Sequence, residues 1–146
     1  GAVASGGSGG LNIDGNTVTS TIGGKVNGTA MFTQTGADVK VVVKLSACPS
    51  GVLGIHINDG DSCDNPGTEG KPWDGKRGNI GDTGSITCAN NSANLTYTRT
   101  GGDPTTNWTI GDHNLKTDIT SYVVIVSSSA DGVSNAAFIG CGNFFK

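Results

Sequence analysis

The stretch "DVKVVVKLS", residues 38–46, decides the fold class of this chain. Apolar side chains occupy every second position of it, at Val39, Val41, Val43 and Leu45. Lys40 and Lys44 fall on alternate positions between them. Successive side chains of a strand point to opposite faces, so the pattern predicts a β-strand with one face in a core and the other in solvent.

Short runs of this kind recur along the chain, and no stretch keeps the apolar spacing of an amphipathic helix for three turns. The further predicted strands are residues 17–22, 28–35, 52–58, 84–89, 94–100, 107–111, 121–127 and 137–142. The turn "TGAD", residues 35–38, would join two of them as a hairpin. The same alternation predicts further core residues: Leu53, Ile55, Ile57, Ile86 and one face of residues 122–126. We therefore expect an all-β domain of eight or nine strands, a sandwich or flattened barrel with Greek-key connections.

The composition fits one domain and narrows the classes of partner. Residues 1–10, "GAVASGGSGG", predict a flexible tail, which leaves residues 11–146 as the folded domain. The net charge of -3 comes with no basic stripe, which argues against a nucleic-acid partner. No apolar run approaches the roughly 20 residues of a membrane span. A protein or a glycan remains as the candidate partner.

Cysteines and glycosylation motifs favour a secreted glycoprotein. The chain has four cysteines and no C-x-x-C pair. Four N-x-S/T motifs offer candidate glycosylation sites at Asn27, Asn90, Asn94 and Asn107. The alternative, that these motifs only reflect an Asn- and Thr-rich composition, stays open.

The stretch "GVLGIHINDGDSC", residues 51–63, raises the question of a metal site. His56 and Asn58 lie two residues apart and share one face of the predicted strand, so a histidine at both positions would direct two imidazoles at one ion. Residues 59–80 follow without a plausible strand, and a loop of about 22 residues in a compact domain is usually functional or derived from a functional one.

Five segments resemble the copper/zinc superoxide dismutase family, in the family's order. They are "GIHINDGDSC" (54–63), "NIGDTGSI" (79–86), "IGDHN" (110–114), "VVIVSSSADG" (123–132) and "FIGCGNF" (138–144). The resemblance runs from Thr17 to the C-terminus. It implies an eight-stranded Greek-key β-barrel with long loops at one end.

The resemblance also implies that the copper site has lost its ligands. The family's copper needs four imidazoles, and only the first position, His56, is a histidine. The other three positions carry Asn58, Asn79 and, depending on the alignment gap, Val126 or Ser127. The whole chain has two histidines, and the second one, His113, is not at a ligand position of the family.

The resemblance also implies that the family's zinc site is missing. Asp82 matches the family's zinc aspartate, but no histidine lies between Cys63 and Asp82, and one carboxylate does not make a tetrahedral zinc site. The family's anion-steering arginine falls on Phe138. The segment "NDGDSCDN" lacks the spacing of a calcium loop. We therefore expect no cofactor, and His56 as a partly buried histidine held by a nearby hydrogen bond.

The resemblance assigns the disulfides. Four cysteines allow three pairings. The family's intrasubunit disulfide falls on Cys63 and Cys141, which leaves Cys48 to pair with Cys88.

These observations predict a secreted, non-enzymatic, superoxide-dismutase-like protein with a structural or binding role. Two alternatives remain open. One is a weak metal-binding or redox protein that uses His56 in a partial site. The other is a carbohydrate- or surface-binding module that uses Trp73, which has Lys71, Lys76 and Arg77 nearby, although a loop tryptophan also serves as a lid packed over the core.

Overall fold

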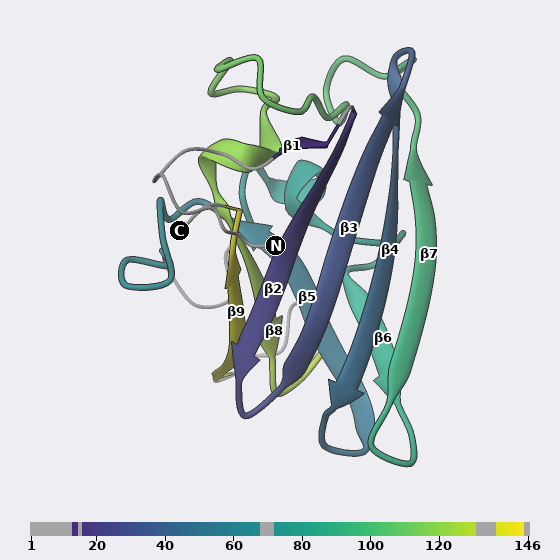
Figure 1. The fold of residues 1–146 in the computed structure, drawn as a ribbon, viewed down its shortest axis with the longest axis vertical. Coiled ribbons are helices and arrows are strands. Elements are labelled where there is room, and N and C mark those ends of the chain that lie inside the picture. Colours follow the sequence, from purple (N-terminus) through teal and green to yellow (C-terminus); the bar gives the residue numbers. More distant parts are fainter. Residues whose placement is uncertain (1–12, 15, 68–71, 131–136, 145–146) are drawn as a thin grey trace.

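The structure, a computed structural model, describes residues 13–14, 16–67, 72–130 and 137–144. The predicted tail, residues 1–10, lies outside them. The described residues are all-β, with two short 3₁₀ helices, η1 and η2 (Figure 1). In chain order the elements are β1 (Ile13–Asp14), β2 (Thr17–Gly24), β3 (Asn27–Thr35), β4 (Asp38–Ala47), β5 (Gly51–Asn58), η1 (Gly75–Gly78), β6 (Ser85–Cys88), β7 (Ala93–Arg99), η2 (Ile119–Ser121), β8 (Val123–Ser127) and β9 (Phe138–Asn143). None of the described helices is long and apolar enough to cross a membrane.

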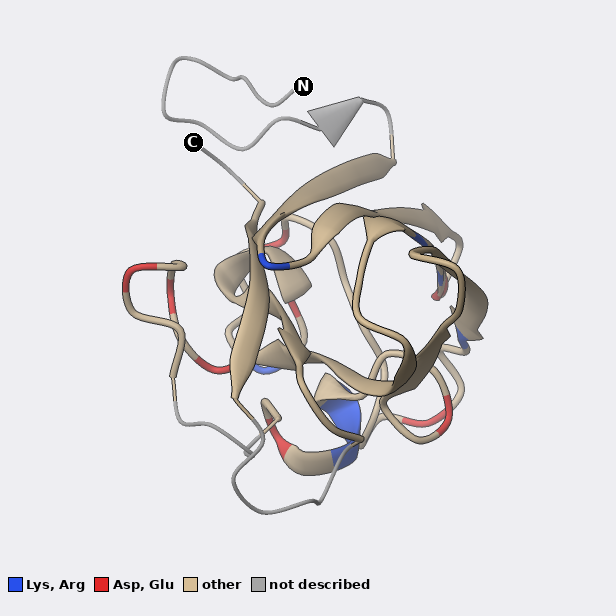
Figure 2. Ribbon diagram, turned by 90° about the horizontal axis from the view of Figure 1, so that it is seen from below, with Lys and Arg blue, Asp and Glu red and all other residues tan. Residues whose placement is uncertain are grey.

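The strands form one antiparallel sheet that curls into a nearly closed barrel. Its order is β6-β5-β8-β9-β2-β3-β4-β7, with β1 added to β2. The two end strands, β6 and β7, lie beside each other and are joined by a tight turn at Asn90 and Asn91, which both have positive φ. Seen from below in Figure 2, the strands surround the core as a ring, and the charged residues are scattered around it.

The predicted core is confirmed where the alternation is clearest. On β4 the four apolar positions of the opening stretch are buried, and the lysines between them are exposed. The predicted hairpin also forms, because Thr35 pairs with Asp38 and Gly36 takes the positive φ that a two-residue turn needs there. Leu53, Ile55, Ile57 and Ile86 are buried as expected.

Strand β8 departs from the expectation that one face of it is buried. All of its residues, Val123–Ser127, are buried. Strand β5 is likewise buried on both faces from Leu53 onward. The cause is the long loop after β5, which lies against these strands. The Asn58 side chain of β5 donates to the carbonyl of Pro66 at 2.6 Å, and Cys63 is bonded to Cys141, the neighbour of Ile125 across β9 and β8.

The strand predicted at residues 107–111 is wrong. This segment is a loop, and its one β-bridge among the described residues joins Thr109 to Asp118. Trp108 is 1% exposed, its ring packs edge-on against Phe32, and its indole N–H donates to the carbonyl of Arg77 at 2.7 Å. The buried ring of Trp108 and the backbone hydrogen bonds of Thr109 to residues 117 and 119 therefore hold this segment outside the sheet.

The barrel has two unlike outer surfaces. Over β5 and β8 the outer side chains are covered by the long loop. Over β2, β3, β4 and β7 the outer side chains are open, and exposed or half-buried threonines predominate among them: Thr17, Thr19, Thr21, Thr29, Thr33, Thr96 and Thr98. The candidate site lies on the covered side.

Candidate functional site

Two disulfides fix the loops around the covered side. Cys63 in the long loop pairs with Cys141 on β9, and Cys48 after β4 pairs with Cys88 on β6. This pairing agrees with the one that the resemblance implies. The backbone N–H of Cys63 also donates to Oδ1 of Asn143 at 2.9 Å, so the loop is bound to β9 at two points.

His56 and Asn79 face each other at the centre of the covered side. Strand β6 pairs with β5 only as far as Gly54, and beyond that point the long loop continues the ladder. His56 pairs there with Asn79 in an antiparallel bridge. A Cβ atom built on Gly84 would lie 2.9 Å from both Nε2 of His56 and Oδ1 of Asn79. Both side chains therefore converge on the space above Gly84, which holds no side chain of its own.

Ser127 completes this group on the other side of His56. It pairs with Gly54 across β5 and β8. A Cβ atom on Gly54 would lie 3.1 Å from Cε1 of His56 and 3.3 Å from Cβ of Ser127. Three residues at the resemblance's copper positions, His56, Asn79 and Ser127, are therefore neighbours. Val126, the other choice for the fourth position, is buried and points into the core with Val124.

Asn58 stands on the same face of β5 and binds the loop. It is 2% exposed, and its Nδ2 atom donates to the carbonyl of Pro66 at 2.6 Å. The amide thus presents its N–H side to the loop backbone. Asn58 therefore joins β5 to the long loop by a hydrogen bond.

These residues do not fit copper or zinc. The group offers one imidazole, His56, beside two neutral amides and a hydroxyl, whereas copper that cycles between two oxidation states favours several imidazoles. Asp82 is exposed. Within the described parts of the chain, no three His, Cys, Asp or Glu side chains lie close enough together to hold a metal ion. The buried Oδ1 atom of Asn79 has no hydrogen-bond partner in the described structure.

Arg77 is a structural residue that the sequence did not reveal. Arg77 belongs to η1, and its buried side chain donates to four acceptors on three residues: the carbonyl and Oδ1 of Asn107, the carbonyl of Pro104, and Oδ2 of Asp74. The distances lie between 2.9 and 3.0 Å. One guanidinium thereby joins the long loop to the segment before Trp108. From the sequence, Arg77 was expected only to be one of the charged residues near Trp73.

Arg99 forms a second buried junction. Its guanidinium lies 4.6 Å from the Trp108 ring centroid and donates to the carbonyls of Asn79 at 2.6 Å and Lys76 at 3.2 Å. Burial removes water from this charged group and lowers its pKa. The alternation along β7 could have predicted the burial of Arg99. Its side chain lies on the same face of the strand as buried Ala93 and half-buried Leu95 and Tyr97.

Trp73 is a packed lid and not an exposed anchor. It is 5% exposed, and its ring stacks on Tyr122 with centroids 4.5 Å apart. The guanidinium of Arg77 lies 5.9 Å from the same ring. Little of the indole is left for a partner, and this burial favours the lid over the interaction anchor. Lys71 lies outside the described residues, and Lys76 is exposed.

His113, the second histidine, is exposed at the tip of a fixed loop. It has a positive φ of 62. The buried carboxylate of Asp118 accepts hydrogen bonds from the backbone N–H groups of Gly111, His113 and Thr120, at 2.8–2.9 Å. Asp118 thus organises the "GDH" segment, and His113 lies outside the group around His56.

The candidate glycosylation sites differ in exposure. Asn27, Asn90 and Asn94 are exposed. Asn107 is half-buried, and its Oδ1 atom is occupied by Arg77 at 3.0 Å. The first three are therefore open to modification, whereas Asn107 has a structural role.

Comparison with known proteins supports the architecture alone. No protein-family model matches the chain. No curated protein matches it. The solved structure of the clock protein EA4 has a similar fold, with a TM-score of 0.63 over 88% of this chain and 92% of that chain. The two sequences are 14% identical, so the similarity is one of fold.

Proposed function

We propose that this protein is a secreted, superoxide-dismutase-like barrel that has given up metal chemistry and serves a structural or binding role. The observation that carries the proposal is the pair formed by His56 and Asn79. They meet at the position that the resemblance assigns to copper, and the groups around them are amides and a hydroxyl. One imidazole beside amides and a hydroxyl is a poor ligand set for a redox metal, which favours several imidazoles.

The strand order supports a Greek-key connection of the superoxide dismutase type. Strands β5, β6 and β7 follow one another in the chain and lie side by side in the order β7, β6, β5. Strand β4, which precedes them, pairs with β7 at the far side of the group. A fourth strand that lies beside the far end of three consecutive strands is the defining arrangement of a Greek key.

The stabilising contacts of the covered side fit a protein that works without a bound ion. A disulfide, the Asn58 amide and two buried arginines hold the long loop in place. Disulfides persist in oxidising compartments, and three exposed N-x-S/T motifs agree with passage through such a compartment.

A dismutation assay with a gain-of-ligand variant tests the proposal. The natural protein and the variant Asn58→His/Asn79→His are each incubated with copper, freed of excess ion and assayed for superoxide removal. We expect the natural protein to match buffer, because it lacks imidazoles at three of four positions, and the variant to retain more copper. A natural protein that works near the diffusional range, about 10⁸–10⁹ M⁻¹s⁻¹, contradicts the proposal.

Secretion has its own test. The full-length coding sequence is expressed in a eukaryotic host, and the protein recovered from the medium is analysed by peptide mass mapping. Glycan is expected on one or more of Asn27, Asn90 and Asn94, and not on Asn107. Retention inside the cell as unmodified protein contradicts this part of the proposal.

A further inference from the structure

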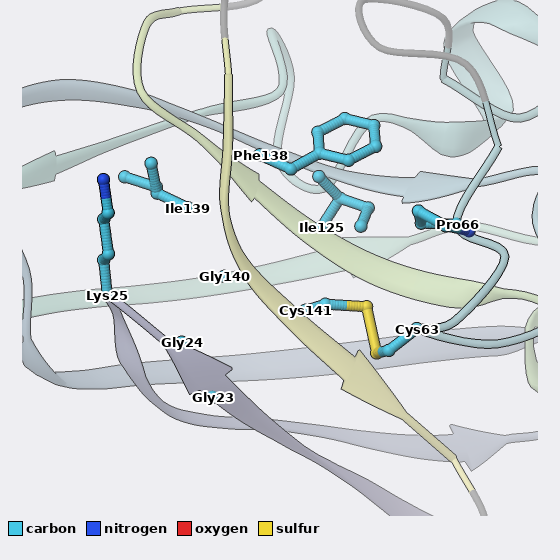
Figure 3. Close-up of a pocket in the computed structure, with 10 residues that line it drawn as sticks. All are labelled: Gly23, Gly24, Lys25, Cys63, Pro66, Ile125, Phe138, Ile139, Gly140 and Cys141. Carbon is cyan, nitrogen blue, oxygen red and sulfur yellow. A yellow bond between two sulfur atoms is a disulfide. The ribbon is translucent and has the colours of Figure 1, made fainter.

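A groove of about 290 Å³ opens on the outer surface of β9 beside the Cys63–Cys141 disulfide (Figure 3). On one side it is bounded by the turn that carries Lys25, and on the other by Pro66 of the long loop. Phe138 and Ile139 rise from β9 between them. Pockets for small ligands begin at roughly 300 Å³, so the groove lies at the lower limit of that range.

The groove exists because one position in a cross-strand row has no side chain. His56, Ile125, Cys141 and Gly23 pair in succession across β5, β8, β9 and β2. The long loop covers the His56 end of this row, and the disulfide occupies its middle. At the other end, a Cβ atom built on Gly23 would meet nothing within 4 Å. The open space thus continues from the disulfide to the edge of β2.

The lining combines apolar walls with one cation. Phe138, Ile139, Pro66 and the disulfide supply the apolar surface, and buried Ile125 lies beneath them as the floor. Lys25 is the only charged residue among the described residues that line the groove. Its side chain extends along the rim next to Ile139 (Figure 3). An ammonium group at the mouth of an apolar groove attracts an anion and repels a cation.

We propose that this groove binds a small organic carboxylate with an apolar body. The carboxylate pairs with the Lys25 ammonium group, and the apolar body lies against Phe138 and Ile139. The inference goes beyond the proposed loss of metal chemistry and does not depend on it, because the groove uses none of the residues at the resemblance's copper positions. It supplies a ligand class for the binding role proposed above.

Titration of methyl-labelled protein with sodium octanoate tests the site. Octylamine, with the same chain and the opposite charge, is the comparison probe at the same ionic strength. We expect saturable chemical shift changes at the methyl groups of Ile125 and Ile139. Octanoate should bind about three- to fivefold more tightly than octylamine, because one partly solvated ion pair contributes modestly. Changes scattered over the whole surface, or equal affinity for both probes, overturn the proposal.

Two glycine variants separate the groove from unspecific binding. Gly23→Leu fills the open space, and octanoate binding should be lost. Gly102→Leu is the matched control, since a Cβ at Gly102 also meets nothing within 4 Å and neither glycine has a positive φ. Gly102 is not among the residues that line the groove, so this variant should bind like the natural protein. Retained binding in a folded Gly23→Leu variant contradicts the proposal.

Lys25→Glu gives a readout that does not depend on filling the groove. Lys25 is exposed, so this variant should fold normally. The preference should then reverse, with octylamine binding more tightly than octanoate. An unchanged preference shows that Lys25 does not select the ligand and overturns the inference. Concentration-dependent groove shifts without any probe would show that a second copy of the chain fills the groove, which also counts against it.

Discussion

His56 and Asn79 pair across an antiparallel bridge, and their side chains meet above the Cα atom of Gly84. This contact lies where β6 stops pairing with β5 and the long loop takes over the ladder. Gly84 has a φ of 69 and its carbonyl accepts from the N–H of Ile55 at 2.8 Å. The position thus requires both a left-handed backbone and the absence of a side chain.

Gly84→Ala should therefore destabilise the protein more than a positive φ alone explains. Gly36→Ala is the control, because Gly36 has a φ of 59 and open space around its Cβ position. We expect a loss of about 1 kcal/mol at Gly36, and an additional loss of roughly 1–3 kcal/mol at Gly84 from crowding. Urea unfolding measures both free energies. Equal losses for the two variants would show that the contact above Gly84 is not tight.

Arg77 should matter far more to stability than its ion pair partner. Arg77→Met leaves the carbonyls of Pro104 and Asn107 without their charged donor, and we expect a loss of about 1–3 kcal/mol. Asp74 is mostly exposed, with 59% of its side chain accessible, so Asp74→Ala should lose less than about 1 kcal/mol. Chemical denaturation of both variants gives the comparison. Similar losses would mean that the ion pair, and not the carbonyl contacts, supports the loop.

The two disulfides should differ in accessibility. Cys48 and Cys88 are buried, whereas Cys63 and Cys141 are half-buried and line the groove. Mild reduction under native conditions, followed by alkylation and peptide mapping, should label Cys63 and Cys141 first. Labelling of Cys48 and Cys88 first would contradict the burial described above.

Removal of either disulfide should cost stability. The bridges close separations of 78 and 40 residues, which in the chain-entropy account corresponds to about 4 kcal/mol each. Paired Cys→Ser variants, unfolded in urea, measure this loss. Losses well under 1 kcal/mol for both pairs would show that the barrel does not depend on its disulfides.

Alkaline pH should weaken the fold through Tyr122. Burial raises the pKa of Tyr122, whose ring stacks on Trp73 and whose hydroxyl donates to the carbonyl of Leu115. A folded-state pKa above the unfolded value means that the contribution is complete below pH 10 and is lost as pH rises through the folded pKa. Unfolding free energies from pH 8 to 12 should therefore fall more steeply for the natural protein than for Tyr122→Phe. Parallel curves for the two proteins would contradict this assignment.

The parts of the fold that follow from local alternation were predictable from the sequence. Strand β4 and its hairpin with β3 obey the period of two because one face meets the core and the other meets water. Strand β8 breaks the rule since a distant loop covers its second face. The alternation within a strand does not show whether a remote segment covers the second face of that strand.

The sequence predicted which residues form the candidate site. It did not predict the buried contacts of Arg77 and Trp108 that hold the surrounding loops. The strand period placed His56 and Asn58 on one face, and the resemblance brought in Asn79. The burial of Arg77 and Trp108 depends on contacts between residues about 30 apart in the chain, at a place with no repeating pattern. From the sequence alone, Arg77 is interpreted as a surface cation and Trp108 as a strand residue, because the contacts that bury them form only when the loops fold together.

Thermal unfolding shows whether this barrel is stable and complete without a metal ion. The protein is melted in EDTA and in the presence of copper or zinc, and bound metal is measured in the same samples. A metal that binds only the folded state raises the midpoint by mass action. We predict superimposable melts and no stoichiometric copper or zinc. A midpoint that rises by several degrees with either ion, together with retained metal, would contradict the account and direct attention to His56 and Asp82.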